Sequence, residues 1–167
     1  MAEGISASVR AQLVIPEQRQ LYDYWTERSR NRPMPERKDI SPADIPRLLP
    51  LISLIEVEES PRRYRVRLAG TRLRDVYDRE TTGLYLDEFD LGDKCDYWHT
   101  AYERLTEDGK PSQGIVRGPR LHKEHLVQYW LRLPLCTEDG RVGMILCYDA
   151  FLPAVDLHDG YPAAISA

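Results

Sequence analysis

The chain has 167 residues, which suits one domain large enough to bury a core. Its net charge of −4 offers no general attraction to nucleic acid or to anionic lipid, and 42% hydrophobic with 30% charged residues is ordinary for a globular protein. No apolar run approaches the roughly 20 residues that span a bilayer, and residues 1–13 lack the apolar core of a signal peptide. We therefore expect a cytoplasmic protein with no nucleic-acid and no membrane partner.

An amphipathic helix is predicted from Pro16 to about Arg30, because proline suits a helix start. Pro33 and Pro35 then end it. The residues that share one face of this helix are Leu21, Tyr24, Trp25 and Arg28. Since the helix precedes the strand-rich part of the chain, we expect it to pack on the flank of the domain or on another chain.

A linker rich in proline and charge follows the helix over residues 31–47. It ends in a short predicted helix from Ser41 to Leu48, with Ser41 as the N-cap. We therefore divide the chain into a flexible N-terminus (1–15), the N-terminal helix and linker (16–47), a core (48–151) and a tail that we expect to be disordered (152–167).

The core opens with two predicted strands, Leu51–Glu58 and Arg63–Leu68, joined by a turn at Glu59–Arg62. A longer helix is predicted over residues 94–107, where Asp108-Gly109 ends it. The apolar stripe of this helix consists of Tyr97, Trp98, Ala101, Tyr102 and Leu105.

Three further strands are predicted at residues 112–121, 126–136 and 141–150. Asp139-Gly140 is a strong hairpin signal between the last two, and it places Leu133 opposite Leu146. One side of this hairpin is then wholly apolar, and we expect it to enclose the interior together with the longer helix. The residues on that side are Val127, Tyr129, Leu131, Leu133, Leu135, Val142, Met144, Leu146 and Tyr148.

The other side of the same hairpin carries an apolar patch of Trp130, Ile145 and Cys147. We expect this patch on the outer surface, where it marks an interface that the N-terminal helix covers, from the same chain or from a dimer mate. The predicted interface residues are Leu21, Tyr24, Trp25, Trp130 and Ile145.

The order of two strands, helices and three strands is not the alternation of a parallel sheet. It predicts an α+β fold, with one antiparallel sheet and helices gathered on one face, preceded by the N-terminal amphipathic helix. Such a half-open cup suits sensing or binding.

Several segments resemble the central signature of PAS sensor domains: residues 68–73 (Leu-Ala-Gly-Thr-Arg-Leu), Val76-Tyr77, Thr82-Gly83 and residues 86–89 (Leu-Asp-Glu-Phe). The Leu-Tyr-Asp-Tyr-Trp run at residues 21–25 is similar to the helix that precedes the core in a bacterial stand-alone PAS-like group, once labelled a domain of unknown function. The resemblance covers residues 17–150. It departs from the family pattern after Tyr77, where Asp78 stands in place of glycine, although aspartate tolerates a left-handed backbone.

The resemblance implies a five-stranded antiparallel sheet, a small-molecule or cofactor pocket beneath its helices, and dimers formed through the N-terminal helix. Tyrosine and tryptophan have the apolar bodies and polar groups that binding pockets use, with plain core packing as the alternative. The predicted pocket residues are Tyr77, Tyr85, Trp98, Tyr102, Tyr129, Leu131, Leu133, Met144 and Tyr148.

The sequence supports neither haem nor flavin, and the cofactor stays unknown. Some PAS sensors hold haem through a helix histidine, but His99 lies roughly 120° from the centre of the apolar stripe and should face the rim or water. Light-sensing relatives use a reactive cysteine in an Asn-Cys-Arg setting, whereas Cys95 stands between acidic residues and does not match that setting. The His122–His125 segment does not have the spacing of a zinc site, so no metal is predicted.

Our first hypothesis is a non-enzymatic sensory and regulatory domain that binds a small ligand or a partner protein and signals through its N-terminal helix and sheet surface. It would be a homodimer that acts through a signalling partner. The alternative is a protein–protein interaction scaffold with a filled core and no ligand. An enzyme ranks last, because the sequence has no nucleophile motif and no glycine-rich phosphate loop, and no catalytic residue is predicted.

Overall fold

The computed structural model describes residues 8–120 and 122–155, which form a five-stranded sheet in the order β2-β1-β5-β4-β3. All neighbouring strands are antiparallel, which confirms the predicted α+β class. The strands are β1 (Ile52–Glu58), β2 (Arg63–Ala69), β3 (Ser112–Arg117), β4 (Leu126–Cys136) and β5 (Val142–Pro153).

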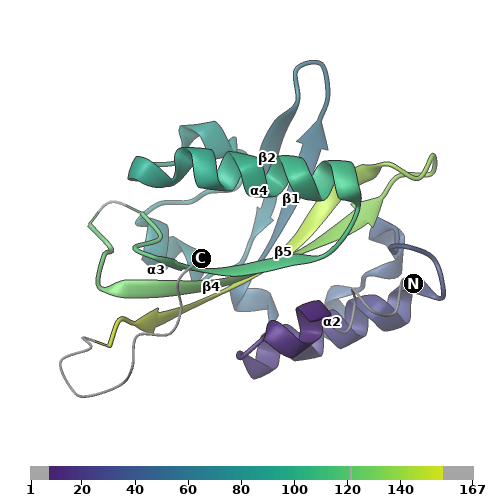
Figure 1. Ribbon diagram of the computed structural model, residues 1–167, viewed down its shortest axis with the longest axis horizontal. Coiled ribbons are helices and arrows are strands. Elements are labelled where there is room, and N and C mark those ends of the chain that lie inside the picture. Colours follow the sequence, from purple (N-terminus) through teal and green to yellow (C-terminus); the bar gives the residue numbers. More distant parts are fainter. Residues whose placement is uncertain (1–7, 121, 156–167) are drawn as a thin grey trace.

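The helices lie on both sides of this sheet, with α4 on one side and α2 on the other (Figure 1). The α-helices with both ends described are α2 (Pro16–Ser29), α3 (Leu73–Tyr77) and α4 (Cys95–Asp108). The 3-10 helices are η1 (Arg37–Asp39), η2 (Pro42–Asp44), η3 (Leu49–Leu51), η4 (Leu86–Glu88) and η5 (Gly92–Lys94). None of the helices in the described ranges has the length and apolar character that crossing a membrane requires.

The β4–β5 hairpin has the predicted register. Leu133 pairs with Leu146 and Leu131 pairs with Tyr148. The amide of Thr137 donates to the carbonyl of Arg141 and closes the turn at 2.8 Å. Turn chemistry and side-chain alternation therefore determine this register together.

The expected interior face was wrong. The side of the hairpin that carries Leu133 and Leu146 faces α2 and the linker, because Leu146 borders a groove with Ile40 and Ile45. The opposite side faces α4, where the indole N–H of Trp130 donates to the Tyr97 hydroxyl at 2.9 Å. An apolar pattern shows that a face is buried but not which helix buries it, and here α2 folds back so that both faces are covered.

Helix α2 packs on the sheet of its own chain. Leu21 is fully buried, and the indole N–H of Trp25 donates to the carbonyl of Pro134 at 2.9 Å. The side-chain amide of Gln18 donates to the carbonyl of Tyr129 at 3.0 Å. These contacts occupy the buried face of the helix within one chain.

The other predicted interface residues lie elsewhere. Tyr24 is half-buried beside the linker, where its hydroxyl donates to Asp44 at 2.8 Å. Trp130 and Ile145 are buried under the α4 side of the sheet, so the expected outer patch is wrong. The reason is the same reversal of faces.

The linker completes the sheet at one edge. Strand β3 pairs with β4 only as far as Arg132, which leaves the last part of β4 without that neighbour. There the amide of Cys136 donates to the carbonyl of Pro35 at 2.9 Å, and Glu36 forms a parallel bridge with Cys136. Residues 35–36 therefore protect an edge that would otherwise be open.

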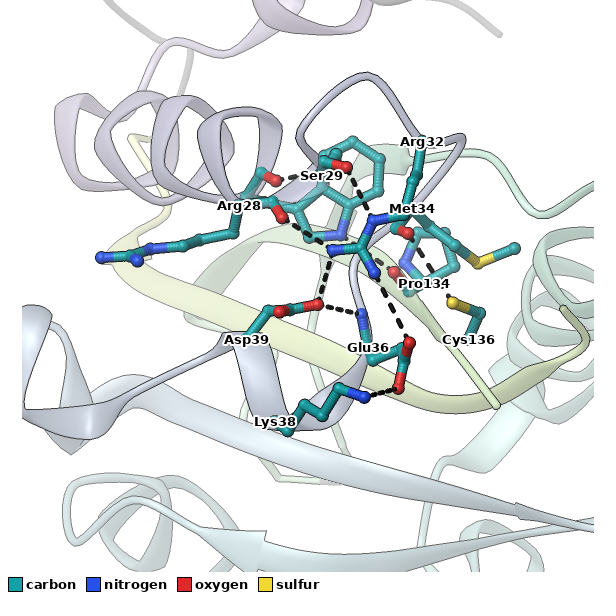
Figure 2. A network of polar contacts seen from close by, with 10 residues as sticks. Arg28, Ser29, Arg32, Met34, Glu36, Lys38, Asp39, Pro134 and Cys136 are labelled. Carbon is teal, nitrogen blue, oxygen red and sulfur yellow. Dashed lines mark hydrogen bonds and ion pairs between the residues drawn. The ribbon is translucent and has the colours of Figure 1, made fainter. Parts of the chain in front are cut away.

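Arg32 ties the end of α2 to this edge segment (Figure 2). Its guanidinium donates to the carbonyl of Ser29 at 3.0 Å and to the carboxylate of Asp39 at 2.6 Å. It also lies 3.5 Å from the carboxylate of Glu36. The cluster fixes the linker relative to α2.

Three boundaries differ from the prediction. Residues 8–12 are helical and Leu13 is buried, so part of the N-terminus that was expected to be flexible is packed. The short helix predicted from Ser41 to Leu48 is reduced to the single turn η2, and the Ser41 side chain does not cap it. Strand β5 continues to Pro153, two residues into the predicted tail, while residues 156–167 lie outside the described residues.

Candidate functional site

A cavity of about 50 Å³ lies between the α4 side of the sheet, α3 and the segment that leads into α4. Its walls are mainly apolar, and its polar groups come from the sheet, from Thr81 and from the hydroxyls of Tyr77 and Tyr102. The apolar walls include Ile55, Val66, Leu73, Leu86, Phe89, Leu91 and Trp98. The polar side chains of the sheet are Ser53, Gln128, Arg132 and Asp149.

A buried ion pair forms the floor of this cavity. Nη2 of Arg132 lies 2.9 Å from Oδ1 of Asp149, and their side chains are 7% and 5% exposed. The same guanidinium donates through Nε to the Tyr102 hydroxyl at 2.9 Å and through Nη1 to the carbonyl of Leu131 at 3.0 Å. A buried pair needs such additional hydrogen bonds, because removing two charges from water is costly.

Aromatic rings surround the buried guanidinium. Its central carbon lies 5.1 Å from the ring centre of Trp98 and 5.7 Å from those of Tyr102 and Trp130. Rings at these distances attract a cation through their negative faces. The α4 helix thus contributes both a wall of the cavity and part of the stabilisation of Arg132.

Gln128 connects the ion pair to the cavity. Its Nε2 donates to Oδ1 of Asp149 at 2.7 Å. Its Oε1 is buried and accepts no hydrogen bond from any described residue. A buried acceptor without a donor is uncommon in folded proteins and costs free energy, so this oxygen indicates a place for a donor.

The cavity collects three of the nine predicted pocket residues, Tyr77, Trp98 and Tyr102. Tyr85 lies outside it, with its hydroxyl on Glu58 at 2.9 Å and the guanidinium of Arg63 at 3.5 Å from its ring centre. The other five residues are on strands that present them to the α2 side, so their assignment to this cavity is corrected: Tyr129, Leu131, Leu133, Met144 and Tyr148.

The polar floor of the cavity was not predicted from the sequence. Gln128, Trp130 and Arg132 alternate along β4 on one face, and Cys147 and Asp149 do so on the neighbouring strand. A basic and an acidic residue that share a sheet face with tryptophan and cysteine are a signal of a buried pair. The pattern is present in the sequence, but the face of the sheet that carries these residues was expected to be the outer one.

A family model for the PAS domain matches residues 14–148. The chain belongs to the PAS domain family. The match confirms the resemblance drawn from the sequence and covers α2 and the linker as well as the sheet. A comparison with curated proteins found no significant match.

Solved structures resemble this PAS domain in fold. The PAS domain of a Colwellia psychrerythraea protein superposes with a TM-score of 0.51 at 7% identity, over 66% of this chain and 96% of that chain. An RNA-binding Light-Oxygen-Voltage receptor gives 0.50 at 11% identity, over 65% of this chain and 32% of that chain. A Rhodobacter sphaeroides LOV protein gives 0.48 at 14% identity, over 65% and 63%. The chain thus spans less than two thirds of both light-oxygen-voltage chains, and identities this low show the fold alone.

The cavity of this PAS domain is small. At about 50 Å³ it has a third of the roughly 150 Å³ that accommodates benzene in an engineered protein cavity. A flavin ring or a haem does not fit that space without rearrangement of its walls. His99, His122 and His125 are exposed, and the described residues contain no group of three or more histidine, cysteine, aspartate and glutamate side chains that could hold a metal ion.

Burial changes the acid–base properties of the groups around the cavity. It raises the pKa of Tyr77, and it raises the pKa of Tyr102 well above the usual range for tyrosine. Burial is the largest single effect and disfavours the charged form of Arg132, but Asp149, Cys147 and Tyr102 together outweigh it and the pKa of Arg132 rises. The tyrosines therefore stay neutral and Arg132 stays charged at neutral pH.

The thiol of Cys147, on the same face, gives a testable pH dependence. Burial raises its pKa from 9.0 to about 11, so the unfolded chain loses this proton at a lower pH than the folded chain. The thiol's contribution to stability is complete below pH 9 and is lost as the pH rises to 11, about 2–3 kcal/mol in all. Urea unfolding at a series of pH values should show a shallower decline for Cys147→Ala than for the unchanged protein. Cys95→Ala, at an exposed position, should leave the slope unchanged, and an equal slope in both variants would contradict the assignment.

A larger groove lies on the other side of the sheet. It has a volume of about 350 Å³ between the linker, the start of β1 and the end of β2. Its walls include Ile40, Ile45, Leu49, Ile52, Leu54 and Leu68. Leu68 is 44% exposed, although regular strand alternation would place it on the same face as buried Tyr64 and Val66. A bulge between Leu54 and Ile55 shifts the pairing there and accounts for the difference.

Proposed function

We propose that this PAS domain is a non-enzymatic sensory and regulatory domain that holds a small ligand in the α4-side cavity and signals through α2. The observation that carries the proposal is the position of Arg132. Its side chain forms the cavity floor, while the strand to which it belongs holds α2 on the opposite face. Both charges of the floor are paired with each other, which favours binding over acid–base catalysis.

The route from the cavity to α2 is short. Arg132 donates to the carbonyl of Leu131, and its neighbours Leu131 and Leu133 are buried toward the α2 side. The two α2 side chains that bond to β4, Gln18 and Trp25, reach carbonyls on either side of Arg132 in the sequence. A ligand that displaces the guanidinium would therefore move the strand on which α2 rests.

The chain's three tryptophans allow a direct test. Trp25 reports on α2, Trp98 on the cavity wall and Trp130 on the space between α4 and β4. With 5-fluorotryptophan incorporated, Arg132→Lys keeps the charge but loses the planar donors of arginine. We expect the fluorine NMR signals of Trp98 and Trp130 to shift, and the signal of Trp25 to shift with them.

The matched control is Arg141→Lys, the same change in an exposed ion pair with Asp139. It should leave all three signals in place. If Arg132→Lys moves only the two signals on the α4 side, α2 does not receive the state of the cavity and the proposed route is wrong.

The second candidate is an interaction scaffold with a filled core, and the sizes of the two hollows favour it. The groove on the α2 side is about 350 Å³, against about 50 Å³ for the cavity. Native and denaturing mass spectrometry of the purified protein separates the two: a mass that is lost on denaturation supports a ligand sensor, and equal masses support the scaffold. The same native spectrum tests whether the protein is a homodimer.

A cytoplasmic location and a signalling partner remain part of the proposal.

A further inference from the structure

We infer that the cavity takes a small, neutral ligand that donates a hydrogen bond to Oε1 of Gln128. The inference rests on the proposed function for the site and adds the chemistry of the ligand. The observation that carries it concerns Gln128, which is 1% exposed and lines the cavity. Its Oε1 has no hydrogen-bond donor among the described residues.

The orientation of the Gln128 amide follows from its partner. An ionised carboxylate can only accept hydrogen bonds, so the side of the amide next to Asp149 must be the N–H₂ group. The carbonyl oxygen is then directed away from Asp149. It needs an N–H or O–H donor, and a second acceptor in the cavity would not satisfy it.

The ligand is neutral because the charges of the floor already cancel. Arg132 and Asp149 form a close pair, and their side chains are almost completely withdrawn from water. An ammonium or carboxylate in the same cavity would remain an unpaired charge and would lose its hydration. A neutral donor brings no such charge.

The walls and the volume set the rest of the ligand. Val66, Leu91 and Trp98 offer apolar contact, so the part of the ligand away from the donor is apolar. A volume of about 50 Å³ exceeds the roughly 30 Å³ that one water occupies in the liquid, and it is a third of the roughly 150 Å³ that accommodates benzene, so the ligand has only a few non-hydrogen atoms. A primary amide of the size of acetamide meets these conditions.

Acetamide and acetone provide a matched pair of probes. They have the same number of non-hydrogen atoms, both are neutral, and only acetamide donates a hydrogen bond. Each is titrated into the fluorotryptophan-labelled protein, with the signal of Trp98 as the measure of occupancy because its ring lines the cavity. We expect saturable shifts, with acetamide binding at least fivefold more tightly than acetone.

The protein variant closes the comparison. Gln128→Met keeps the length of the side chain and removes the acceptor, so acetamide should lose its advantage over acetone. Gln113→Met, the same change on β3 outside the cavity, should keep it. Should Gln128→Met fail to fold, the two probes still decide the matter on the unchanged protein.

Equal affinity for both probes would overturn the inference, and so would the absence of saturation by either probe, which would mean that the cavity holds water only. The two proposals fail separately. A shift of Trp98 on binding acetamide without a shift of Trp25 removes the role of α2 but leaves the ligand assignment intact. A Trp25 response to Arg132→Lys without discrimination between the probes does the reverse.

Discussion

Asp149→Ala is expected to lower the free energy of unfolding by about 3–5 kcal/mol, because it leaves Arg132 buried without its counter-charge. The unpaired charge cannot be removed by deprotonation of the guanidinium, since arginine stays protonated in proteins. Gln128 loses the acceptor of its Nε2 at the same time. Urea unfolding followed by circular dichroism measures the change, which is a large share of the 5–15 kcal/mol typical of folded domains.

A double substitution distinguishes the effect of an unpaired charge from the effect of lost side-chain packing. Arg132→Met with Asp149→Leu replaces both charges by apolar groups, and we expect it to recover at least half of the loss, since paired removal of buried charges is often nearly neutral. Asp139→Ala removes the acid of the exposed pair with Arg141 and should cost far less than Asp149→Ala, because solvent screens exposed ion pairs. A double variant as unstable as Asp149→Ala would show that the charges themselves are not the cause.

Trp25→Ala is expected to cost about 3–5 kcal/mol, the usual range for removing a large buried aromatic side chain. The indole is 4% exposed between α2 and the sheet, and the substitution also removes the donor to the carbonyl of Pro134. Because these contacts lie within one chain, the loss should appear in the free energy of unfolding and not depend on protein concentration. Urea unfolding at two concentrations tests this point.

Two further variants resolve the origin of that loss. Trp25→Phe keeps most of the apolar volume and removes the hydrogen-bond donor. It should lower the free energy of unfolding by about 1 kcal/mol beyond the loss expected from the smaller buried apolar area. Tyr24→Ala, on the half-buried flank of the same helix, should cost less than Trp25→Ala. If Trp25→Ala leaves the unfolding midpoint unchanged, the packing of α2 described above is wrong.

The sheet was predictable because two local signals agreed on it. Asp139-Gly140 determined the turn, and the alternation that pairs Leu133 with Leu146 would be lost by a slip of one residue. Helix α2 was predictable to within one residue of its end from Pro16 and the prolines that follow. The antiparallel class then followed from the order of elements.

The site was less accessible, because it depends on which helix covers which face. The strongly apolar side with Leu131 and Leu133 matched the expectation for the interior beneath α4, but α2 occupies it. Polar residues such as Gln128 and Arg132 indicate an outer face until a second covering layer is known. Contacts between residues more than 100 positions apart, such as Gln18 with Tyr129, decide the question, and no local pattern encodes them.

The short segment at residues 35–36 has a consequence for how a signal would leave this domain. While it is in place, it satisfies the amide of Cys136 and covers the part of β4 that lies beyond the start of β3. Any event that pulls α2 away, carrying the segment that Arg32 ties to it, uncovers a bare stretch of backbone. The unpaired N–H and C=O groups of a strand edge can form hydrogen bonds with an added extended peptide. Detachment of α2 would thus expose an unpaired edge of β4, with which a strand of a partner protein could pair.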